Sequence, residues 1–126
     1  MLAPDLLFWL VQVCAIYDVP PALPLAVMRM ESGPHFKCGP LGKRGQFIGP
    51  GGIDKSFRVK WNIDDPKENI RLVVAAFAGK KTEAQIVKRI KKYNPKWKEN
   101  NYLRDVLICY RSYQGIQGRS DPRRRP

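Results

Sequence analysis

Apolar side chains recur at helical spacing along this chain, and prolines or glycines separate the segments that show this spacing. In residues 4–17 they return every three to four positions, which is typical of a buried amphipathic helix. Pro20 and Pro21 interrupt that helix, because proline cannot continue one. A second apolar helix is expected over 21–31, since proline is tolerated in a first turn. The pattern predicts a mainly α-helical fold.

Start and stop signals predict three more helices in the second half of the chain. Residues 65–68, Asp-Pro-Lys-Glu, supply an N-cap, a first-turn proline and the glutamate of a capping box, and Gly79 ends the helix that they begin. Thr82 and Gln85 form a second capping box, and a last helix is expected over 101–113. The sequence therefore predicts about five helices.

Residues 32–62 are rich in glycine and turn-forming residues. A loop of this length inside a compact domain is usually functional or disordered. A short hairpin is the alternative, with Phe47, Ile48, Phe57 and Val59 as anchors of its strands. The sequence leaves both possibilities open for the segment between the second and third helices.

The net charge is the strongest compositional signal, since 23 basic and 11 acidic residues give +12. Much of this charge lies in the run from Lys80 to Lys98, which is either an ordinary solvated helix face or a surface for an anionic polymer. Nucleic acid, anionic membrane and anionic cell wall are all attracted by such a field, so the charge does not choose among them. A length of 126 residues fits a single domain.

The sequence gives no signal for a metal centre, a cofactor or a membrane span, and we expect neither metal nor cofactor. His35 is the single histidine and no CxxC pair occurs, which argues against a zinc site. Cys14 and Cys109 lie in apolar helical patterns, where free thiols are expected to be buried. The apolar start of the chain carries Asp5 and lacks a basic region, so we interpret it as a core helix and expect no export signal.

Glu31 is the first candidate for chemistry. It follows the apolar run Leu-Pro-Leu-Ala-Val-Met-Arg-Met and precedes Ser32 and Gly33, where a core helix meets the irregular segment. Partial burial there disfavours the carboxylate and raises its pKa toward the range of a proton donor near neutral pH. Position alone, however, favours an ordinary surface glutamate at a helix end.

Four short motifs then occur in order along the chain, namely Tyr17–Pro21 with the helix ending in Glu31-Ser32, Gly49–Ile53, the Asp-Pro to Asn-Ile helix start at 65–70, and Tyr93-Asn94. Over roughly residues 3–113 they resemble the soluble lytic transglycosylase domain, which is related to goose-type lysozymes. Each motif is common by itself. Their order, and their positions relative to the predicted helices, are much harder to obtain by chance.

The resemblance implies a lysozyme-like helical domain with its helices around a cleft, spanning residues 1–115 and followed by a flexible basic tail at 116–126. It implies non-hydrolytic cleavage of the MurNAc–GlcNAc linkage of peptidoglycan to 1,6-anhydroMurNAc ends. Glu31 would be the acid and then the base, and Tyr93 would hydrogen-bond near Glu31 or the acetamido group, unless its ring only faces the core. The positions implied for substrate binding are Ser32, Gly52, Ile53, Asp54, Lys55 and Asn94.

Two of these positions depart from the family or have a second interpretation. Asp54 and Lys55 stand where the family usually has Met-Gln, which puts one sugar contact in doubt. Asp54 is either a second carboxylate near the cleft or, as we favour, a solvated loop residue. Ser32 either binds sugar or peptide or caps the turn that follows. A lysozyme-like hydrolase and a catalytically dead wall-binding relative are therefore the alternatives to a lytic transglycosylase.

The competing class is a nucleic-acid-binding module, in which Tyr93, Trp97 and Tyr102 alternate with basic residues. No helix-turn-helix or other nucleic-acid signature accompanies them, so nucleic acid is the less favoured partner. The expected partners are peptidoglycan strands and an anionic wall surface bound by the basic face. We expect a monomer acting at the cell wall, in the periplasm or outside the cell, in a phage or an envelope setting.

Overall fold

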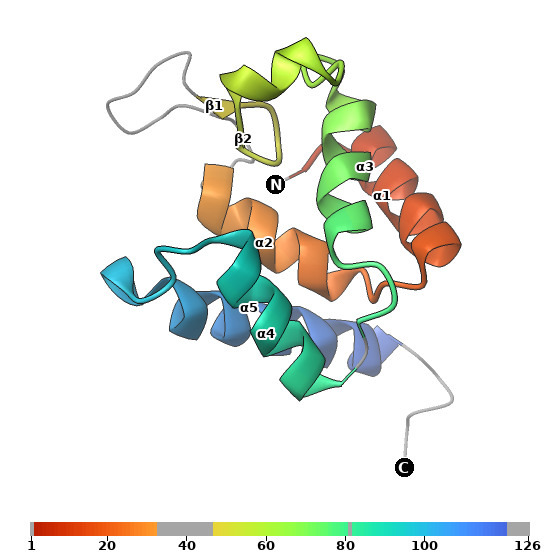
Figure 1. The fold of residues 1–126 in the computed structure, drawn as a ribbon. Coiled ribbons are helices and arrows are strands. Elements are labelled where there is room, and N and C mark those ends of the chain that lie inside the picture. Colours follow the sequence, from red (N-terminus) through yellow and green to blue (C-terminus); the bar gives the residue numbers. More distant parts are fainter. Residues whose placement is uncertain (1, 33–46, 81, 121–126) are drawn as a thin grey trace.

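The computed structural model describes residues 2–32, 47–80 and 82–120, which form a mainly α-helical fold with five helices and a short β-hairpin between the second and third. This confirms the predicted mainly α class (Figure 1). The elements in chain order are α1 (Pro4–Tyr17), α2 (Ala22–Ser32), β1 (Phe47–Ile48), β2 (Ile53–Asp54), the 3-10 helix η1 (Lys55–Val59), α3 (Pro66–Ala76), α4 (Glu83–Tyr93), the 3-10 helix η2 (Glu99–Asn101) and α5 (Tyr102–Ser120).

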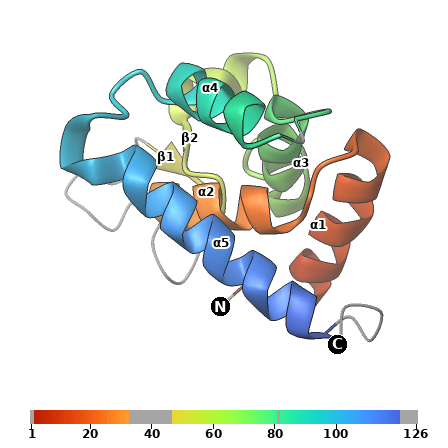
Figure 2. The same ribbon diagram turned by 90° about the horizontal axis from the view of Figure 1, so that it is seen from below.

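Helix α2 is the centre of the fold. It packs against α5 on one side and α3 on another, and α1 lies outside α3 (Figure 1). Seen from below, α5 runs along α2 (Figure 2). Because it is covered from several directions, α2 is apolar around most of its circumference, and its buried side chains include Ala22, Leu23, Ala26, Val27 and Met28.

Helix α1 begins and ends where the sequence predicted. Pro4 occupies its first turn, and Asp18 ends it in the left-handed conformation at φ 58°. Leu10 and Val13 face the core, as expected from their spacing. The opposite side of α1 is apolar too and lies exposed at positions that include Phe8. The expectation of a buried helix therefore holds for one face only.

The helix starts of α3 and α4 show how far capping rules reach. Asp65 caps α3 as predicted, accepting a hydrogen bond from the backbone two residues on. Glu68, expected to complete a capping box, instead forms an ion pair with Arg71, which is the stronger partner for a carboxylate. The Thr82–Gln85 box of α4 is confirmed, with its two reciprocal hydrogen bonds at 3.2 and 3.1 Å.

The hairpin is the second of the two possibilities that the sequence left open. Strand β1 pairs antiparallel with β2, so that Phe47 lies opposite Asp54 and Ile48 opposite Ile53. Phe57 and Val59 were expected to anchor strands and do not, because the chain turns into η1 directly after β2 and exposes both side chains. The Asp54 carboxylate starts that turn by accepting a hydrogen bond from the Ser56 N–H at 2.9 Å.

Helix α5 continues to Ser120, past the predicted end at residue 113 and into the segment assigned to a tail. The reason is that no proline occurs before Pro122, and two glycines alone do not stop a helix that has already been nucleated. The expectations for His35 and for residues 121–126 lie outside the described residues. Among the helices that are described, none has the length and apolarity needed to cross a bilayer.

Candidate functional site

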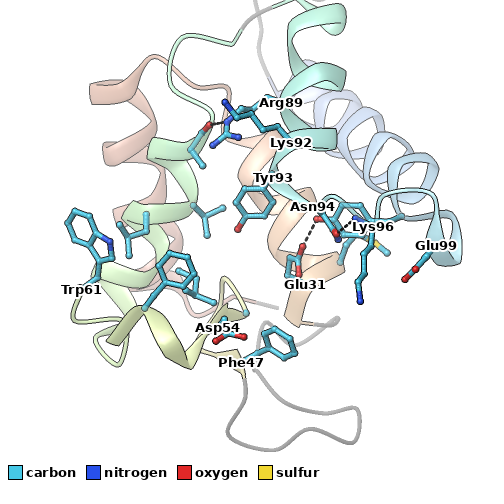
Figure 3. A pocket seen from close by; sticks show the side chains of 18 residues that line it. Glu31, Phe47, Asp54, Trp61, Arg89, Lys92, Tyr93, Asn94, Lys96 and Glu99 are labelled. Atoms are coloured by element: carbon cyan, nitrogen blue, oxygen red, sulfur yellow. Dashed lines mark hydrogen bonds between the residues drawn. The ribbon is translucent and has the colours of Figure 1, made fainter. Parts of the chain in front are cut away.

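A cavity of about 890 Å³ lies where the end of α2, the hairpin, α3 and the end of α4 meet. Its walls come from segments far apart in the sequence, with Glu31 from α2, Asp54 from β2 and Tyr93 from α4 (Figure 3). A cavity of this size holds more than one small sugar-sized group. The fold therefore places the predicted catalytic residues in one concave site.

Glu31 lies in the last turn of α2 and points into this cavity (Figure 3). The hydroxyl of Tyr102, from the first turn of α5, donates a hydrogen bond to Glu31 Oε1 at 2.6 Å. Burial raises the pKa of Glu31 above its usual value, and the hydrogen bond from Tyr102 opposes part of that rise. The carboxyl is thus half-buried, fixed in orientation, and inclined to keep its proton at a higher pH than an ordinary glutamate.

Tyr102 is a residue that the sequence analysis named only among the aromatics of a nucleic-acid surface and did not connect with Glu31. It is buried, but its hydroxyl reaches the cavity, where the side chain of Asn94 lies close enough to oppose part of the rise in its pKa. Burial and the negative charge of Glu31 raise the pKa of Tyr102 far above its usual range. Tyr102 therefore stays protonated and remains a donor. Tyr102 and Glu31 are thus hydrogen-bonded to each other, and Asn94 lines the cavity beside them.

Tyr93 has the core contact that the sequence left open and also reaches the cavity wall. Its ring packs on Phe77 in the core, with centroids 5.4 Å apart, and its hydroxyl end lines the cavity (Figure 3). Burial, followed by the charge of Glu31, raises the pKa of Tyr93. Tyr93 therefore lies near the carboxyl, but the hydroxyl that binds Glu31 is that of Tyr102.

The glycine turn between β1 and β2 is held by a buried amide, that of Asn69 in α3. Asn69 Nδ2 donates to the carbonyls of Ile48 and Ile63 at 2.8 and 3.0 Å, and its Oδ1 accepts from Gly51 N at 2.7 Å. A Cβ atom on Gly49 would lie 2.5 Å from Asn69 Nδ2, and the backbone there has φ +70°. The turn therefore requires glycine in order to approach α3 this closely.

The same turn packs on the end of α2 beside the candidate acid. Gly52 has φ +57°, and a Cβ there would lie 2.8 Å from the backbone oxygen of Glu31. Ser32 is 2% exposed, and its hydroxyl lies 2.7 Å from the Met28 carbonyl and 2.6 Å from the Pro50 carbonyl. The sequence left open whether Ser32 binds substrate or caps the turn, and in the structure its hydroxyl contacts backbone carbonyls. It fastens the turn to α2 and does not line the cavity.

The remaining candidates divide between the cavity wall and the surface. Gly52, Ile53, Asp54 and Asn94 line the cavity, whereas Lys55 is exposed in η1 and does not belong to its lining. Several lining side chains were not predicted, because their neighbours in space come from distant elements, and these are Phe47, Phe57, Trp61, Arg89, Lys92, Lys96 and Glu99. Within residues 2–32, 47–80 and 82–120, no three Cys, His, Asp or Glu side chains group as metal ligands.

Comparison of the chain with protein-family models, with curated proteins and with solved structures gives no match in any of the three. Any functional conclusion therefore depends on the geometry of the site and on the motif resemblance.

Proposed function

We propose that this protein is a peptidoglycan lytic transglycosylase that cleaves the MurNAc–GlcNAc β-1,4 linkage without water and acts at the cell wall. The single observation that carries the proposal is the half-buried Glu31 carboxyl. Its pKa is raised by burial, its orientation is fixed by Tyr102, and it points into a cavity large enough for more than one sugar unit. These are the properties required of a general acid for glycosidic bond cleavage.

The proposed first step transfers the Glu31 proton to the glycosidic oxygen as the bond between that oxygen and the muramyl C1 breaks. Most glycosidases use a second carboxylate on the opposite face of the sugar. Here the N-acetyl oxygen of the muramyl residue takes that role and stabilises the positive charge at C1. The GlcNAc hydroxyl leaves with the proton, and Glu31 becomes a carboxylate.

The second step uses the same residue in the reverse sense. The Glu31 carboxylate removes the proton from the C6 hydroxyl of the muramyl residue, and the C6 oxygen bonds to C1 to close the anhydro ring. The Tyr102 hydroxyl stabilises the carboxylate between the two steps, because a hydrogen bond at 2.6 Å to an ionised oxygen is a strong one. Tyr102 therefore favours proton release in step one and holds Glu31 in place for step two.

The cavity walls supply contacts suited to a sugar chain. Phe47 and Phe57 are 39% and 51% exposed, respectively, and both line the cavity beside the hairpin. Aromatic faces of this kind pack on the apolar C–H faces of pyranose rings. Asn94 adds an amide to the wall at the point where it meets Tyr102. The site thus combines apolar surface with a few convergent polar groups, as ligand pockets do.

Asp54 favours a second candidate, a peptidoglycan hydrolase, because its carboxylate lines the same cavity as Glu31 (Figure 3). In that reaction Asp54 would position a water molecule to attack C1. The two products differ by one water, so mass spectrometry of the fragments released from murein separates the reactions. Anhydro ends support the transglycosylase, and reducing ends support the hydrolase.

The deciding experiment is a murein zymogram of the wild-type chain beside Glu31→Gln. This change keeps the shape of the side chain and removes the transferable proton, so activity is expected to fall by about 10²- to 10⁴-fold. Glu83→Gln is the matched control, because that carboxylate is exposed and pairs with Arg111 at the surface. Full activity in Glu31→Gln would assign the chemistry to another residue.

A further inference from the structure

Arg89 and Lys92 form a pair of cations on the wall of the cavity. They lie three residues apart in α4, so they share one face of the helix, and they sit beside Tyr93 at one end of the site (Figure 3). Arg89 Nε donates a hydrogen bond to the carbonyl of Ala76 in α3. This contact fixes the guanidinium between α3 and α4 and uses Nε, which leaves its terminal N–H groups for another acceptor.

The charges around this pair leave it available to an anion. The other ionisable side chains of the cavity wall are Glu31, Asp54, Lys96 and Glu99, and Figure 3 shows all four away from Arg89 and Lys92. Among the residues that the structure describes, no ion pair includes Arg89 or Lys92, and the pairs found there are Arg58–Asp64, Arg71–Glu68, Arg104–Asp105 and Arg111–Glu83.

We propose that Arg89 and Lys92 bind a carboxylate of the substrate, so that the cavity selects a carboxylate-bearing glycan over a neutral one. The inference rests on the proposed function and names its substrate class. A planar guanidinium beside an ammonium group is a strong recognition unit for a carboxylate. Arg89 is close enough to the reacting region that its charge acts on Tyr93, the neighbour of Glu31.

Muramyl glycans and polymers of N-acetylglucosamine differ in whether they carry a carboxylate. In a muramyl glycan every second sugar carries a lactyl ether that ends in a carboxylate, or in a peptide that carries carboxylates. A polymer of N-acetylglucosamine alone has the same backbone and acetamido groups but no charge. The proposed acid acts on a linkage that both glycans share, so the cation pair is a feature of the site that would distinguish them.

The test measures binding of two tetrasaccharides to the full chain carrying Glu31→Gln, in which cleavage is slow enough for binding to be measured. The ligands are a peptide-free GlcNAc–MurNAc tetrasaccharide with free lactyl carboxylates and the neutral tetramer of N-acetylglucosamine. We expect the anionic tetrasaccharide to bind roughly tenfold more tightly, a preference that shrinks as salt is raised to about 0.5 M. Lys92→Gln and Lys92→Glu should remove the preference, because they weaken binding of the anionic ligand far more than binding of the neutral one.

Lys88→Gln is the matched control, because Lys88 lies on the same helix, is exposed, and does not line the cavity. The preference should survive in that variant. Equal affinity for both tetrasaccharides, or the same loss in Lys88→Gln as in Lys92→Gln, overturns the inference and leaves the proposed function intact. Failure of both ligands to bind overturns the two together, and so does tighter Lys92-dependent binding of a short single-stranded oligonucleotide.

Discussion

Tyr102→Phe tests the mechanism most directly, because it removes one oxygen atom and leaves a buried ring in place. The lost hydroxyl lies 2.6 Å from Glu31 Oε1 and stabilises the ionised form that appears in the first step. Hydrogen bonds to charged groups contribute about 1.5–3 kcal/mol, which corresponds to about a 10- to 150-fold loss of rate. The maximal rate of murein cleavage should therefore be about 10- to 150-fold lower in Tyr102→Phe than in the wild type.

The pH dependence should change in a definite direction as well. The pKa of Glu31 is raised by burial and partly lowered by Tyr102, so removing the hydroxyl raises it further. The first step needs the protonated acid, and activity is lost as pH rises through that pKa. In Tyr102→Phe the alkaline decline of the rate should therefore lie at higher pH than in the wild type, even though the maximal rate is lower.

The assay is the release of soluble fragments from murein, followed across the pH range for both chains. Tyr110→Phe is the control, because Tyr110 lies on the same helix and its hydroxyl receives a hydrogen bond from Gln114 at 2.8 Å, away from the cavity. It should keep the wild-type rate and profile. An unchanged rate and an unchanged alkaline limb in Tyr102→Phe would refute the reasoning.

Three further predictions concern stability and the glycine turn. Because the pKa of Glu31 is raised in the folded state, the fold loses stability as pH rises from the usual glutamate pKa through the raised one. Glu31→Gln should therefore be more stable than the wild type in urea unfolding at neutral pH. The two should be equally stable at about pH 3, where Glu31 is protonated in both states. Asn69→Ala breaks three hydrogen bonds of a buried amide and should cost roughly 3 kcal/mol in urea unfolding, whereas the exposed Asn62→Ala should cost almost nothing. Gly52→Ala and Gly79→Ala both place a side chain at positive φ, which should cost about 1–2 kcal/mol of stability. Only the Cβ at Gly52 would meet Glu31, so only Gly52→Ala should also lower the murein cleavage rate. Equal cleavage rates in the two variants would contradict this.

Helix positions were predictable because their causes are local. The prolines after α1, the Asp65 cap and the Thr82–Gln85 box act within a few residues, and the structure places the corresponding helix boundaries close to the expected positions. The end of α5 was not predicted, since the expected helix stops at residue 113 while the backbone continues as a helix to Ser120. The spacing of apolar residues shows where a helix packs against another element, whereas the helical propensity of the backbone decides where the helix ends.

The site was predictable only as far as its motifs reach. Glu31 and Tyr93 each belong to a short motif of the resemblance, Glu31-Ser32 and Tyr93-Asn94, and both line the cavity. Tyr102 does not, because its contact with Glu31 joins residues 71 positions apart. Its aromatic ring satisfied the core pattern, and the pattern gave no information about its hydroxyl. Arg89 and Lys92 on α4 were missed for a similar reason. A run of basic residues predicts only a solvated helix face, and the sequence does not show which of them border a cavity.

The contact between Glu31 and Tyr102 has a consequence for how the catalyst is assembled. The carboxyl belongs to the amino-terminal half of the chain and the hydroxyl that orients it to the carboxyl-terminal half, so the two meet at the seam between α2 and α5. Neither half contains a complete proton-transfer unit. Under the proposed function, murein cleavage should therefore appear only once the two halves of the chain have docked.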